Sequence, residues 1–429
     1  MKERIAIVDG LRTPFVKAGT LLSEYSADDL GAIPVRELMA RVSLSYSDID
    51  EVIIGNVAQP SNAANIGRVI ALKSGFPNTI SAYTVHRNCA SGFESISSGA
   101  VKILAGEAEC IVAGGTESMS NIPFLYSKKM KSFFEALTRA KTISQKLSVL
   151  TSFRLHFLTP TIGLVDGLTD PVCNLIMGLT AENLAKEFVV SRHEQDDYAL
   201  QSTLKTVQAV EARVFDSEIT PVPSPVKMDE LITHDFGFRT DQTMQALEKL
   251  RPYFDKKNGS VTVGNSCPVT DGAAAVIVMS ETKAKSLGIQ PLGYLRDFAY
   301  AGLEPHRMGL GPVYATHAVF EKSGLTLSDI DLVEMNEAFA VQIIANLKAF
   351  ESKEFGKKYL GRTSALGKIN MSILNVNGGA IGLGHPVGTT GTRLVITLLH
   401  ELRRRGLKRG LATLCIGGGQ GGSFILESE

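Results

Sequence analysis

The sequence has no excess of charge of either sign. Its 429 residues include 44 Lys and Arg against 44 Asp and Glu, which gives a formal net charge of zero at neutral pH. A chain without net charge creates no long-range field that attracts a polyanion or a membrane surface. Composition therefore gives no indication of nucleic acid as a partner, and an anionic ligand has to be met by a local basic patch.

Cysteine is scarce and scattered, and the N-terminus lacks a long apolar run. The five cysteines are odd in number and include no C-x-x-C pair, so neither a disulfide framework nor a zinc ribbon is indicated. Met1-Lys-Glu-Arg leads directly into the strand-like Ile5-Ala-Ile-Val-Asp, without the apolar core of a signal peptide. We therefore expect free thiols in a cytoplasmic protein.

The chain does contain an alternation of strand-like and helical segments, which is typical of an α/β fold. In addition, the segment Leu44-Ser-Tyr-Ser-Asp-Ile-Asp-Glu-Val-Ile-Ile-Gly-Asn returns as Leu325-Thr-Leu-Ser-Asp-Ile-Asp-Leu-Val-Glu-Met-Asn. Because the distance between the two copies is that of a whole domain, the repeat predicts two similar α/β domains. Each copy is expected to be a turn that leads into a strand ending in Asn56 or Asn336.

A long interruption separates the two halves. Residues 120–249 are rich in helix formers and poor in strand-like runs, which predicts an inserted helical loop domain. The expected division is an N-terminal domain from 1–119 and 250–290, an insert from 120–249, and a C-terminal domain from 291–429.

Part of this insert is strongly basic. Between 128 and 154 the only acidic residue is Glu135, and apolar residues recur at helical spacing. The basic residues of the segment are Lys128, Lys129, Lys131, Arg139, Lys141, Lys146 and Arg154. The pattern predicts a basic amphipathic helix whose charged face is solvated and which docks on the rest of the insert. Contact with a membrane surface or with phosphate is the alternative.

Cys89 is the first candidate nucleophile. It follows the strand-like Ala82-Tyr-Thr-Val and precedes a helical stretch whose apolar face holds Phe93, Ile96, Ala100 and Leu104. Cys89 is therefore expected at a helix N-terminus, where free N–H groups and the helix dipole stabilise a thiolate and can bind an oxyanion. A lone cysteine is more often a small buried core residue, but these flanks favour a reactive thiol.

A histidine and a second cysteine lie on glycine-dense segments near the C-terminus. His385 stands in a Gly-His-Pro loop before a helix, and Cys415 ends a strand before Gly417-Gly-Gly. Imidazole is the usual proton-transfer group near neutral pH, and glycines allow a ligand to approach the backbone closely. Each residue also has a plain structural interpretation, as a hydrogen-bonded histidine or a buried strand cysteine. Together with Cys89 they indicate thioester chemistry, in which one thiolate attacks a carbonyl while a base and a second thiol move protons.

Asn336 follows the second copy of the repeated strand, in Asn336-Glu-Ala-Phe-Ala. An amide at a strand end could face the same crevice as the other loops. The segment is equally compatible with a helix start that has Asn336 as its N-cap, so its weight as a site residue comes from the other candidates.

Taken together, these segments resemble the thiolase family over nearly the whole chain. The matching segments are Val8-Asp-Gly-Leu-Arg-Thr-Pro-Phe, Asn88-Cys-Ala-Ser-Gly, Ala113-Gly-Gly-Thr-Glu-Ser-Met-Ser, Met177-Gly-Leu-Thr-Ala-Glu-Asn, Thr270-Asp-Gly-Ala-Ala-Ala, Asn336-Glu-Ala-Phe-Ala, Gly384-His-Pro and Cys415-Ile-Gly-Gly-Gly-Gln-Gly. The resemblance implies two thiolase-fold domains in α-β-α-β-α layers, with a helical loop domain inserted in the first. It also implies coenzyme A (CoA) as a substrate that enters beside that loop, no permanently bound cofactor, and a homodimer or a dimer of dimers.

The resemblance further implies a role for each candidate residue. Cys89 is expected to be the acylated nucleophile, His385 its activator and an oxyanion donor, and Cys415 the acid and base at the α carbon. Asn336 is expected to position a water in one oxyanion hole, and the backbone N–H groups of Cys89 and Gly417 are expected to form the other. The implied reaction is CoA-dependent cleavage of a 3-ketoacyl-CoA, or its reverse, a Claisen condensation.

Within the family, the chain is most similar to the beta subunit of trifunctional beta-oxidation complexes and its bacterial counterpart. Segments such as Ser127-Lys-Lys-Met-Lys and Gly293-Tyr-Leu-Arg-Asp-Phe carry this likeness. It implies 3-ketoacyl-CoA thiolase activity in fatty acid beta-oxidation, a hydratase/dehydrogenase alpha subunit as partner, and peripheral membrane contact through 128–154. Two positions depart from the subfamily patterns. Asn336 stands where trifunctional-type enzymes usually have histidine, and Ile176 stands where short-chain biosynthetic thiolases have histidine.

Other functions remain open from the sequence. An acetyl-CoA acetyltransferase, which makes or cleaves acetoacetyl-CoA, would share every candidate residue and differ only in the acyl pocket. A ketoacyl synthase would need a second histidine at Cys415, and a noncatalytic lipid-binding protein would not need the candidate residues together. A metal site made of Cys89, His385 and Cys415 lacks the close ligand spacing of such sites. Cys267, where the family often has serine near the pantetheine arm, is assigned no catalytic role.

Overall fold

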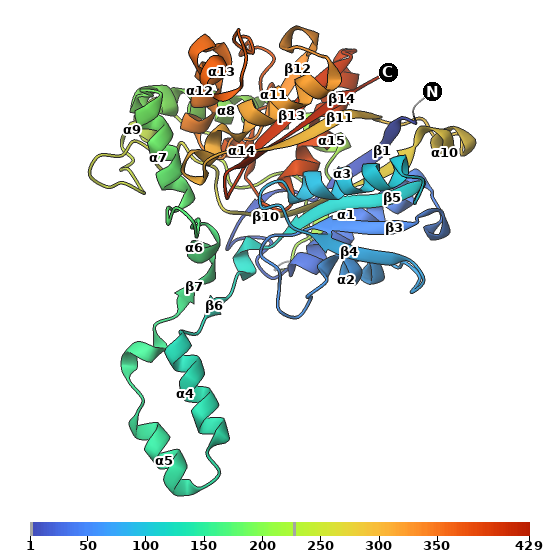
Figure 1. Ribbon diagram of the computed structural model, residues 1–429. Helices are drawn as coiled ribbons and strands as arrows, with labels where there is room; N and C mark the ends of the chain where they lie inside the picture. Colours follow the sequence, from blue (N-terminus) through green and yellow to red (C-terminus); the bar gives the residue numbers. More distant parts are fainter. Residues whose placement is uncertain (1–2, 226–228) are drawn as a thin grey trace.

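The computed structural model describes residues 3–225 and 229–429. Met1 and Lys2, which belong to the N-terminal start considered above, and 226–228 of the insert lie outside the described residues. Figure 1 shows a layered body and a thin arm that extends from it.

A 10-stranded mixed sheet runs through both halves of the described chain. The N-terminal half contributes β1 (Ile5–Arg12), β2 (Val16–Lys17), β3 (Glu51–Gly55), β4 (Ser81–Val85), β5 (Cys110–Glu117) and β10 (Thr270–Ser280). The C-terminal half contributes β11 (Gly293–Gly302), β12 (Leu332–Met335), β13 (Arg409–Ile416) and β14 (Gln420–Glu427). The halves join where β1 pairs antiparallel with β11.

The strand pairing repeats between the two halves. In the first half β3 is parallel to β5, and the pairs β5–β10 and β10–β1 are antiparallel. In the second half β12 is parallel to β13, and the pairs β13–β14 and β14–β11 are antiparallel. A capped 3-10 turn, Tyr46–Asp48 or Leu327–Asp329, precedes β3 or β12. This shared topology confirms the duplication that the sequence repeat predicts.

Helices form three layers around the two half-sheets. The first half-sheet is covered by α1 (Ala27–Val42) and α2 (Ile66–Lys73), and the second by α11 (Gly311–Ser323) with α12 (Ala340–Glu351) beside it. Between the half-sheets lie α3 (Ser91–Leu104) and α15 (Thr390–Arg405), which contact each other. The predicted α-β-α-β-α layering is therefore confirmed.

The middle layer is an apolar core shared by both halves. It combines side chains of both half-sheets with those of α3 and α15, and Phe93 of α3 stacks on Phe424 of β14 with ring centroids 4.0 Å apart. As predicted, Ile96 and Ala100 of α3 are also buried here, whereas Leu104, in the last turn, is exposed. Burial of apolar surface from two halves in one core ties the halves into a single body.

The two central helices touch backbone to backbone at their N-terminal ends. A Cβ atom on Gly92 of α3 would lie 2.7 Å from the Thr392 nitrogen, and one on Gly391 of α15 would lie 2.4 Å from the Phe93 nitrogen. Across the contact, Thr392 Oγ1 donates to the Gly92 carbonyl at 3.3 Å. Only glycine permits such an approach, and the contact brings together the loops that precede the two helices.

The insert, which interrupts the N-terminal half between β5 and β10, is mostly helical. Its elements are β6 (Phe124–Leu125), α4 (Lys128–Arg139), α5 (Ile143–Thr151), β7 (Thr161–Ile162), α6 (Gly163–Gly167), α7 (Met177–Glu187), α8 (Arg192–Glu211), β8 (Val222–Pro223), β9 (Leu231–Ile232) and α9 (Met244–Glu248). Elsewhere the chain forms the short helices α10 (Glu281–Ser286), α13 (Lys353–Tyr359) and α14 (Ala380–Leu383). Helices α7 and α8 contact α12, so this part of the insert rests on the C-terminal half.

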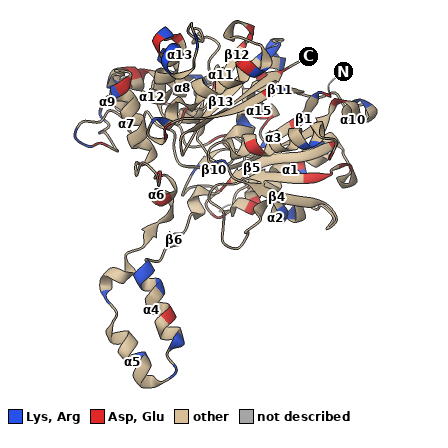
Figure 2. Ribbon diagram, in the orientation of Figure 1, with Lys and Arg blue, Asp and Glu red and all other residues tan. Residues whose placement is uncertain are grey.

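The basic segment does not form the single docked helix that its spacing predicts. It breaks into α4 and α5 because Thr142 and Gln145 form a capping box that starts a new helix. Both helices belong to the arm, residues 124–162, which extends away from the body in Figures 1 and 2. Inside the arm, Phe133 contacts Phe153 and Phe157. The predicted docking on the rest of the insert is therefore wrong. Within 3–225 and 229–429, none of the helices has the length and apolar character that a membrane crossing requires.

The contact between the central helices makes a testable prediction for stability. In Gly391→Ala the added Cβ would overlap the α3 backbone, so the free energy of unfolding should fall by about 1–3 kcal/mol, as for other overpacked sites. Denaturant titration measures this change. The matched control is Gly302→Ala, whose Cβ would meet no atom within 4 Å and which should change stability by less than about 0.5 kcal/mol. Equal stability of the two variants would contradict the role of the contact.

Candidate active site

Cys89 lies in the loop between β4 and α3, immediately before the helix. The N-cap residue, Ala90, makes no side-chain capping bond, and the Ser91 N–H donates to the Asn88 carbonyl at 2.9 Å. Asn88 has φ of 44°, a left-handed conformation that asparagine tolerates better than most residues. Its side-chain Nδ2 donates to the Gly417 carbonyl at 2.7 Å. This bond joins the Cys89 loop to the turn between β13 and β14.

The β13–β14 turn brings a second thiol and a backbone donor to Cys89. Burial raises the pKa of the Cys89 thiol, while the backbone N–H groups of Gly417 and Cys89 itself oppose that rise. Cys415, in the last part of β13, is buried. Its pKa is raised well above the usual value by burial and then by the neighbouring Cys89 and Cys267. The predicted pair Cys89 and Cys415, together with Gly417, is therefore assembled in one place.

His385 is held in a defined tautomer. It is buried in the loop between α14 and α15, where its backbone N–H donates to Thr270 Oγ1 at 3.2 Å. The Thr390 hydroxyl donates its single proton to the Pro386 carbonyl at 3.0 Å. The hydroxyl must then accept from Nδ1–H of His385, which lies 2.6 Å away. Nε2 is left as the basic nitrogen of the ring.

Asn336 faces this basic nitrogen. It comes directly after β12, and its Nδ2 lies 3.5 Å from Nε2 of His385. Its backbone N–H donates to the Thr413 carbonyl at 2.9 Å, so it is a strand-end residue and not the N-cap of α12, which is Phe339. Asn56, which ends the first copy of the repeat, binds different groups. Its Nδ2 donates to the Thr116 carbonyl and to Glu117.

Burial keeps the imidazole neutral. Burial, and then the positive charge of Arg393, lowers the pKa of His385 to about 3. Arg393 is itself buried and pairs with Glu334 of β12 at 2.9 Å. His385 is therefore an unprotonated base throughout the neutral pH range, and the Cys89 and Cys415 thiols, whose pKa values are raised, remain protonated.

Two neighbours of the candidate residues, Thr390 and Arg393, went unrecognised in the sequence, and a third, Cys267, was named there without a catalytic role. Thr390 orients His385, Arg393 sets the charge beside it, and Cys267 lies within electrostatic reach of Cys89. Burial and the Cys89 charge raise the pKa of Cys267 to about 12. A hydroxyl in the first turn of a helix that follows a catalytic histidine, and an arginine inside an apolar helical run, are the signals that could have singled out the first two.

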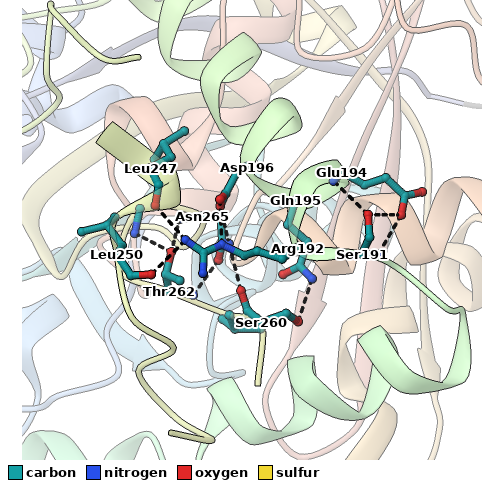
Figure 3. Close-up of polar contacts among 12 residues, drawn as sticks. Ser191, Arg192, Glu194, Gln195, Asp196, Leu247, Leu250, Ser260, Thr262 and Asn265 are labelled. Atoms are coloured by element: carbon teal, nitrogen blue, oxygen red, sulfur yellow. Dashed lines mark hydrogen bonds and ion pairs between the residues drawn. The ribbon is translucent and has the colours of Figure 1, made fainter. Parts of the chain in front are cut away.

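Residues of the insert also hold Asn265, two residues before Cys267, and Figure 3 shows these contacts. Arg192 of α8 pairs with Asp196 at 2.6 Å and donates to the Leu247 carbonyl at 2.7 Å. Asp196 in turn accepts from Asn265 Nδ2 at 2.9 Å. Further along the same segment, the Cys267 N–H donates to the Ala338 carbonyl at 3.1 Å. Ala338 lies two residues after Asn336.

The arrangement suits acyl transfer between thiols. It combines the Cys89 thiol at a helix N-terminus, a neutral imidazole with an unprotonated Nε2, a second thiol, and backbone N–H groups that can bind an oxyanion. Strand ends of both half-sheets and the N-terminal ends of both central helices supply these groups. Fold and site together define an acyltransferase that handles thioesters.

Comparison with known proteins agrees with this class. The N-terminal domain of thiolase matches residues 5–282, and the C-terminal domain of thiolase matches residues 289–428. The chain belongs to the thiolase family.

Relatives of known name and structure cover the whole chain. A Yersinia enterocolitica protein named 3-ketoacyl-CoA thiolase is 44% identical over 428 residues, which is 100% of this chain and 97% of the relative. A Pseudoalteromonas translucida protein of the same name is 41% identical, over 99% of this chain and 97% of its own. The crystal structure of human mitochondrial 3-ketoacyl-CoA thiolase in complex with CoA matches with a TM-score of 0.86 and 36% identity, over 100% of this chain and 98% of the other. Bacillus anthracis acetyl-CoA acetyltransferase matches with the same TM-score of 0.86 and 35% identity, over 100% and 99%.

The neutral resting site predicts how Cys89 reacts with iodoacetamide. Because burial raises the pKa of Cys89 and holds the pKa of His385 at about 3, the thiol should carry its proton at neutral pH. The alkylation rate should then rise about tenfold per pH unit from about pH 6 to about pH 8.5. Mass spectrometry of the Cys89 peptide follows the labelling, with Cys89→Ala as control. A rate that is flat between those limits would reveal a thiolate–imidazolium pair and contradict the prediction.

Proposed function

We propose that the protein is a 3-ketoacyl-CoA thiolase, which cleaves a 3-ketoacyl-CoA with CoA into acetyl-CoA and a shortened acyl-CoA. The observation that carries the proposal is the convergence of two thiols, a neutral imidazole and an amide from both halves of the chain. Membership of the thiolase family and the names of its relatives support the same reaction.

In the first half of the reaction, Cys89 becomes acylated. Its proton passes to Nε2 of His385, and the thiolate attacks the 3-keto carbonyl carbon of the substrate. The bond between C2 and C3 then breaks, which leaves the acyl group on Cys89 and the enolate of acetyl-CoA. The Cys415 thiol gives its proton to the enolate carbon, and acetyl-CoA leaves.

In the second half, the acyl group passes to CoA. The Cys415 thiolate takes the proton of the incoming CoA thiol, and the CoA thiolate attacks the acyl carbon on Cys89. The Cys89 thiolate leaves and recovers its proton from His385. The backbone N–H groups of Cys89 and Gly417 stabilise the oxyanion at the acyl carbon, and protonated His385 with a water held by Asn336 stabilises the enolate oxygen.

A second candidate is acetyl-CoA acetyltransferase activity, which makes or cleaves acetoacetyl-CoA. The likeness to the Bacillus anthracis acetyl-CoA acetyltransferase favours it. Both reactions use the same acid, base and nucleophile, so only the size of the acyl group separates them.

The deciding experiment compares acyl-chain lengths. CoA-dependent loss of 3-ketohexadecanoyl-CoA and of acetoacetyl-CoA is measured for the wild type, Cys89→Ala and Cys173→Ala. We expect faster cleavage of the long chain and a loss of kcat of about 1,000-fold or more in Cys89→Ala, because the nucleophile is gone. Cys173→Ala, a matched change at a partly exposed cysteine, should retain activity.

Each outcome has a distinct meaning. A strict preference for acetoacetyl-CoA would move the protein to the acetyltransferase reaction. Absence of Cys89-dependent turnover on either substrate would contradict thiolase activity and leave a noncatalytic lipid-binding role.

The wider setting follows from the same proposal. We place the protein in fatty acid beta-oxidation in the cytoplasm, as a homodimer or dimer of dimers, with a hydratase/dehydrogenase alpha subunit as partner. The domains are 1–119 with 250–290, the insert 120–249, and 291–429, a division that the repeated strand pairing supports.

The arm is proposed as the point of peripheral membrane contact. Its α5 exposes apolar side chains to solvent, including Ile143 at 79% and Leu147 at 58% of their surface. Basic residues accompany them on the same arm, as Figure 2 shows. Apolar side chains beside basic ones suit the interface of an anionic lipid bilayer.

Vesicle binding tests the arm directly. The double variant Ile143→Ser/Leu147→Ser should bind anionic phospholipid vesicles at least about fivefold more weakly than the wild type, because it loses apolar surface for insertion. Its kcat in solution should not change. Val172→Ser, at another exposed apolar residue, is the matched control. Equal vesicle binding by all three proteins would assign membrane contact to another surface or to none.

A further inference from the structure

Glu117 is a buried carboxylate that contacts two loops of the site. It ends β5 and is 0% exposed. Its Oε1 accepts from the Ala58 N–H at 2.8 Å and from Asn56 Nδ2 at 3.1 Å, and its Oε2 accepts from the Val57 N–H at 3.1 Å and the Gly388 N–H at 3.0 Å. Four N–H donors around one carboxyl group favour its ionised form, because a carboxylate can accept hydrogen bonds at both oxygens and has no proton that would need an acceptor.

Two of the elements joined by Glu117 are packed without intervening side chains. A Cβ on Gly115 of β5 would lie 2.1 Å from the Gly388 carbonyl, and one on Gly388 would lie 2.7 Å from Glu117 Oε2. Gly388 belongs to the loop that carries His385. Because the gap holds no other side chain, the position of Gly388 depends on the carboxylate that accepts its N–H.

The His385 loop is also anchored by Thr270, which accepts the His385 N–H at 3.2 Å, and by the hydroxyl of Thr390. That hydroxyl fixes the ring tautomer, and it lies two residues beyond Gly388. Displacement of Gly388 would therefore move both the backbone of His385 and the hydroxyl that orients its imidazole. Asn56 and Ala58 are not among the reacting groups. Glu117 therefore acts on the chemistry through the Gly388 N–H, and its negative charge also raises the pKa of Cys89.

We propose that Glu117 is a positioning residue for the reaction, whose carboxylate holds the His385 loop at its working distance from Cys89 by accepting the Gly388 N–H. This inference rests on the proposed thiolase function and deepens it. It assigns to Glu117 no contact with substrate.

The hydrogen bond by which Glu117 holds the Gly388 N–H depends on the negative charge of Glu117. Burial, and after it the nearby Asp271 of β10, raises the pKa of Glu117 to about 7 against the lowering effect of its N–H donors. Below this pH one carboxyl oxygen carries a proton and can no longer accept an N–H. The other titratable groups that face this region are Cys89, whose pKa is raised, and His385, whose pKa is about 3. Neither loses or gains a proton near pH 7, so kcat should fall as Glu117 becomes protonated.

One other buried carboxyl group has to be separated from this effect. Burial also raises the pKa of Glu334 to about 7. Glu334 pairs with Arg393 at 2.9 Å, and within the described part of the chain it has no hydrogen bond to the Gly388 loop. Glu334→Gln is therefore the matched control for Glu117→Gln, since both remove one buried carboxylate of similar pKa.

The test is the pH dependence of kcat for CoA-dependent 3-ketoacyl-CoA cleavage, between about pH 5.5 and about pH 9. The wild type should lose activity below an apparent pKa of about 7. Glu117→Gln should lack this acid limb. Its kcat at about pH 8 should be roughly 10- to 100-fold lower than that of the wild type, because His385 is misplaced. Its KM for CoA should not change, because the CoA site is not altered. Glu334→Gln should retain the limb.

Persistence of the acid limb in Glu117→Gln, or its loss in Glu334→Gln alone, would overturn the inference. A wild type without any cleavage would overturn the proposed function instead. Should Glu117→Gln fail to fold, the other two proteins decide. An acid limb near pH 7 that survives in Glu334→Gln supports the inference, and a flat wild-type profile overturns it.

Discussion

The contact between the backbones of α3 and α15 is the constraint on which the site depends. Gly92 and Gly391 allow the two helices to meet at their N-terminal ends, at distances that no side chain would permit. One helix follows Cys89, the proposed nucleophile, and the other follows the loop of His385. Because both helices are buried in the core shared by the half-sheets, the position of one loop relative to the other is set by the most rigid part of the molecule.

Burial also determines the protonation states of the residues in the site. It raises the pKa values of the thiols and lowers the pKa of His385, so the resting site holds uncharged groups. Separated charges in this environment would cost much of their hydration free energy. The N–H groups of Gly417 and Cys89 offset part of that cost for the Cys89 thiolate. Charge can therefore develop where those donors point, which is where a thioester carbonyl would lie.

Duplication gave the two halves the same framework, and equivalent residues of the two halves have since diverged in what they bind. The two halves share strand pairing and the turn before the repeated strand, yet their strand-end asparagines serve different purposes. Asn336 faces the imidazole of His385, whereas Asn56 binds Glu117 and the backbone beside it. One half thus provides the amide beside the base, and the equivalent region of the other half holds the loop on which the base lies.

The sequence by itself determined the α/β class, the duplication, the insert and the residue types of the chemistry. Alternating apolar runs, a long repeat and glycine-flanked Cys89, His385 and Cys415 are local patterns, and local patterns can be read along a chain. Tertiary structure alone decided what depends on contacts between distant residues. The tautomer of His385 set by Thr390, the buried Arg393 and Glu117, and the break that turns the basic segment into an extended arm all follow from such contacts. Burial and hydrogen-bond partners arise only when segments hundreds of residues apart meet in one core, so no spacing within a single segment could reveal them.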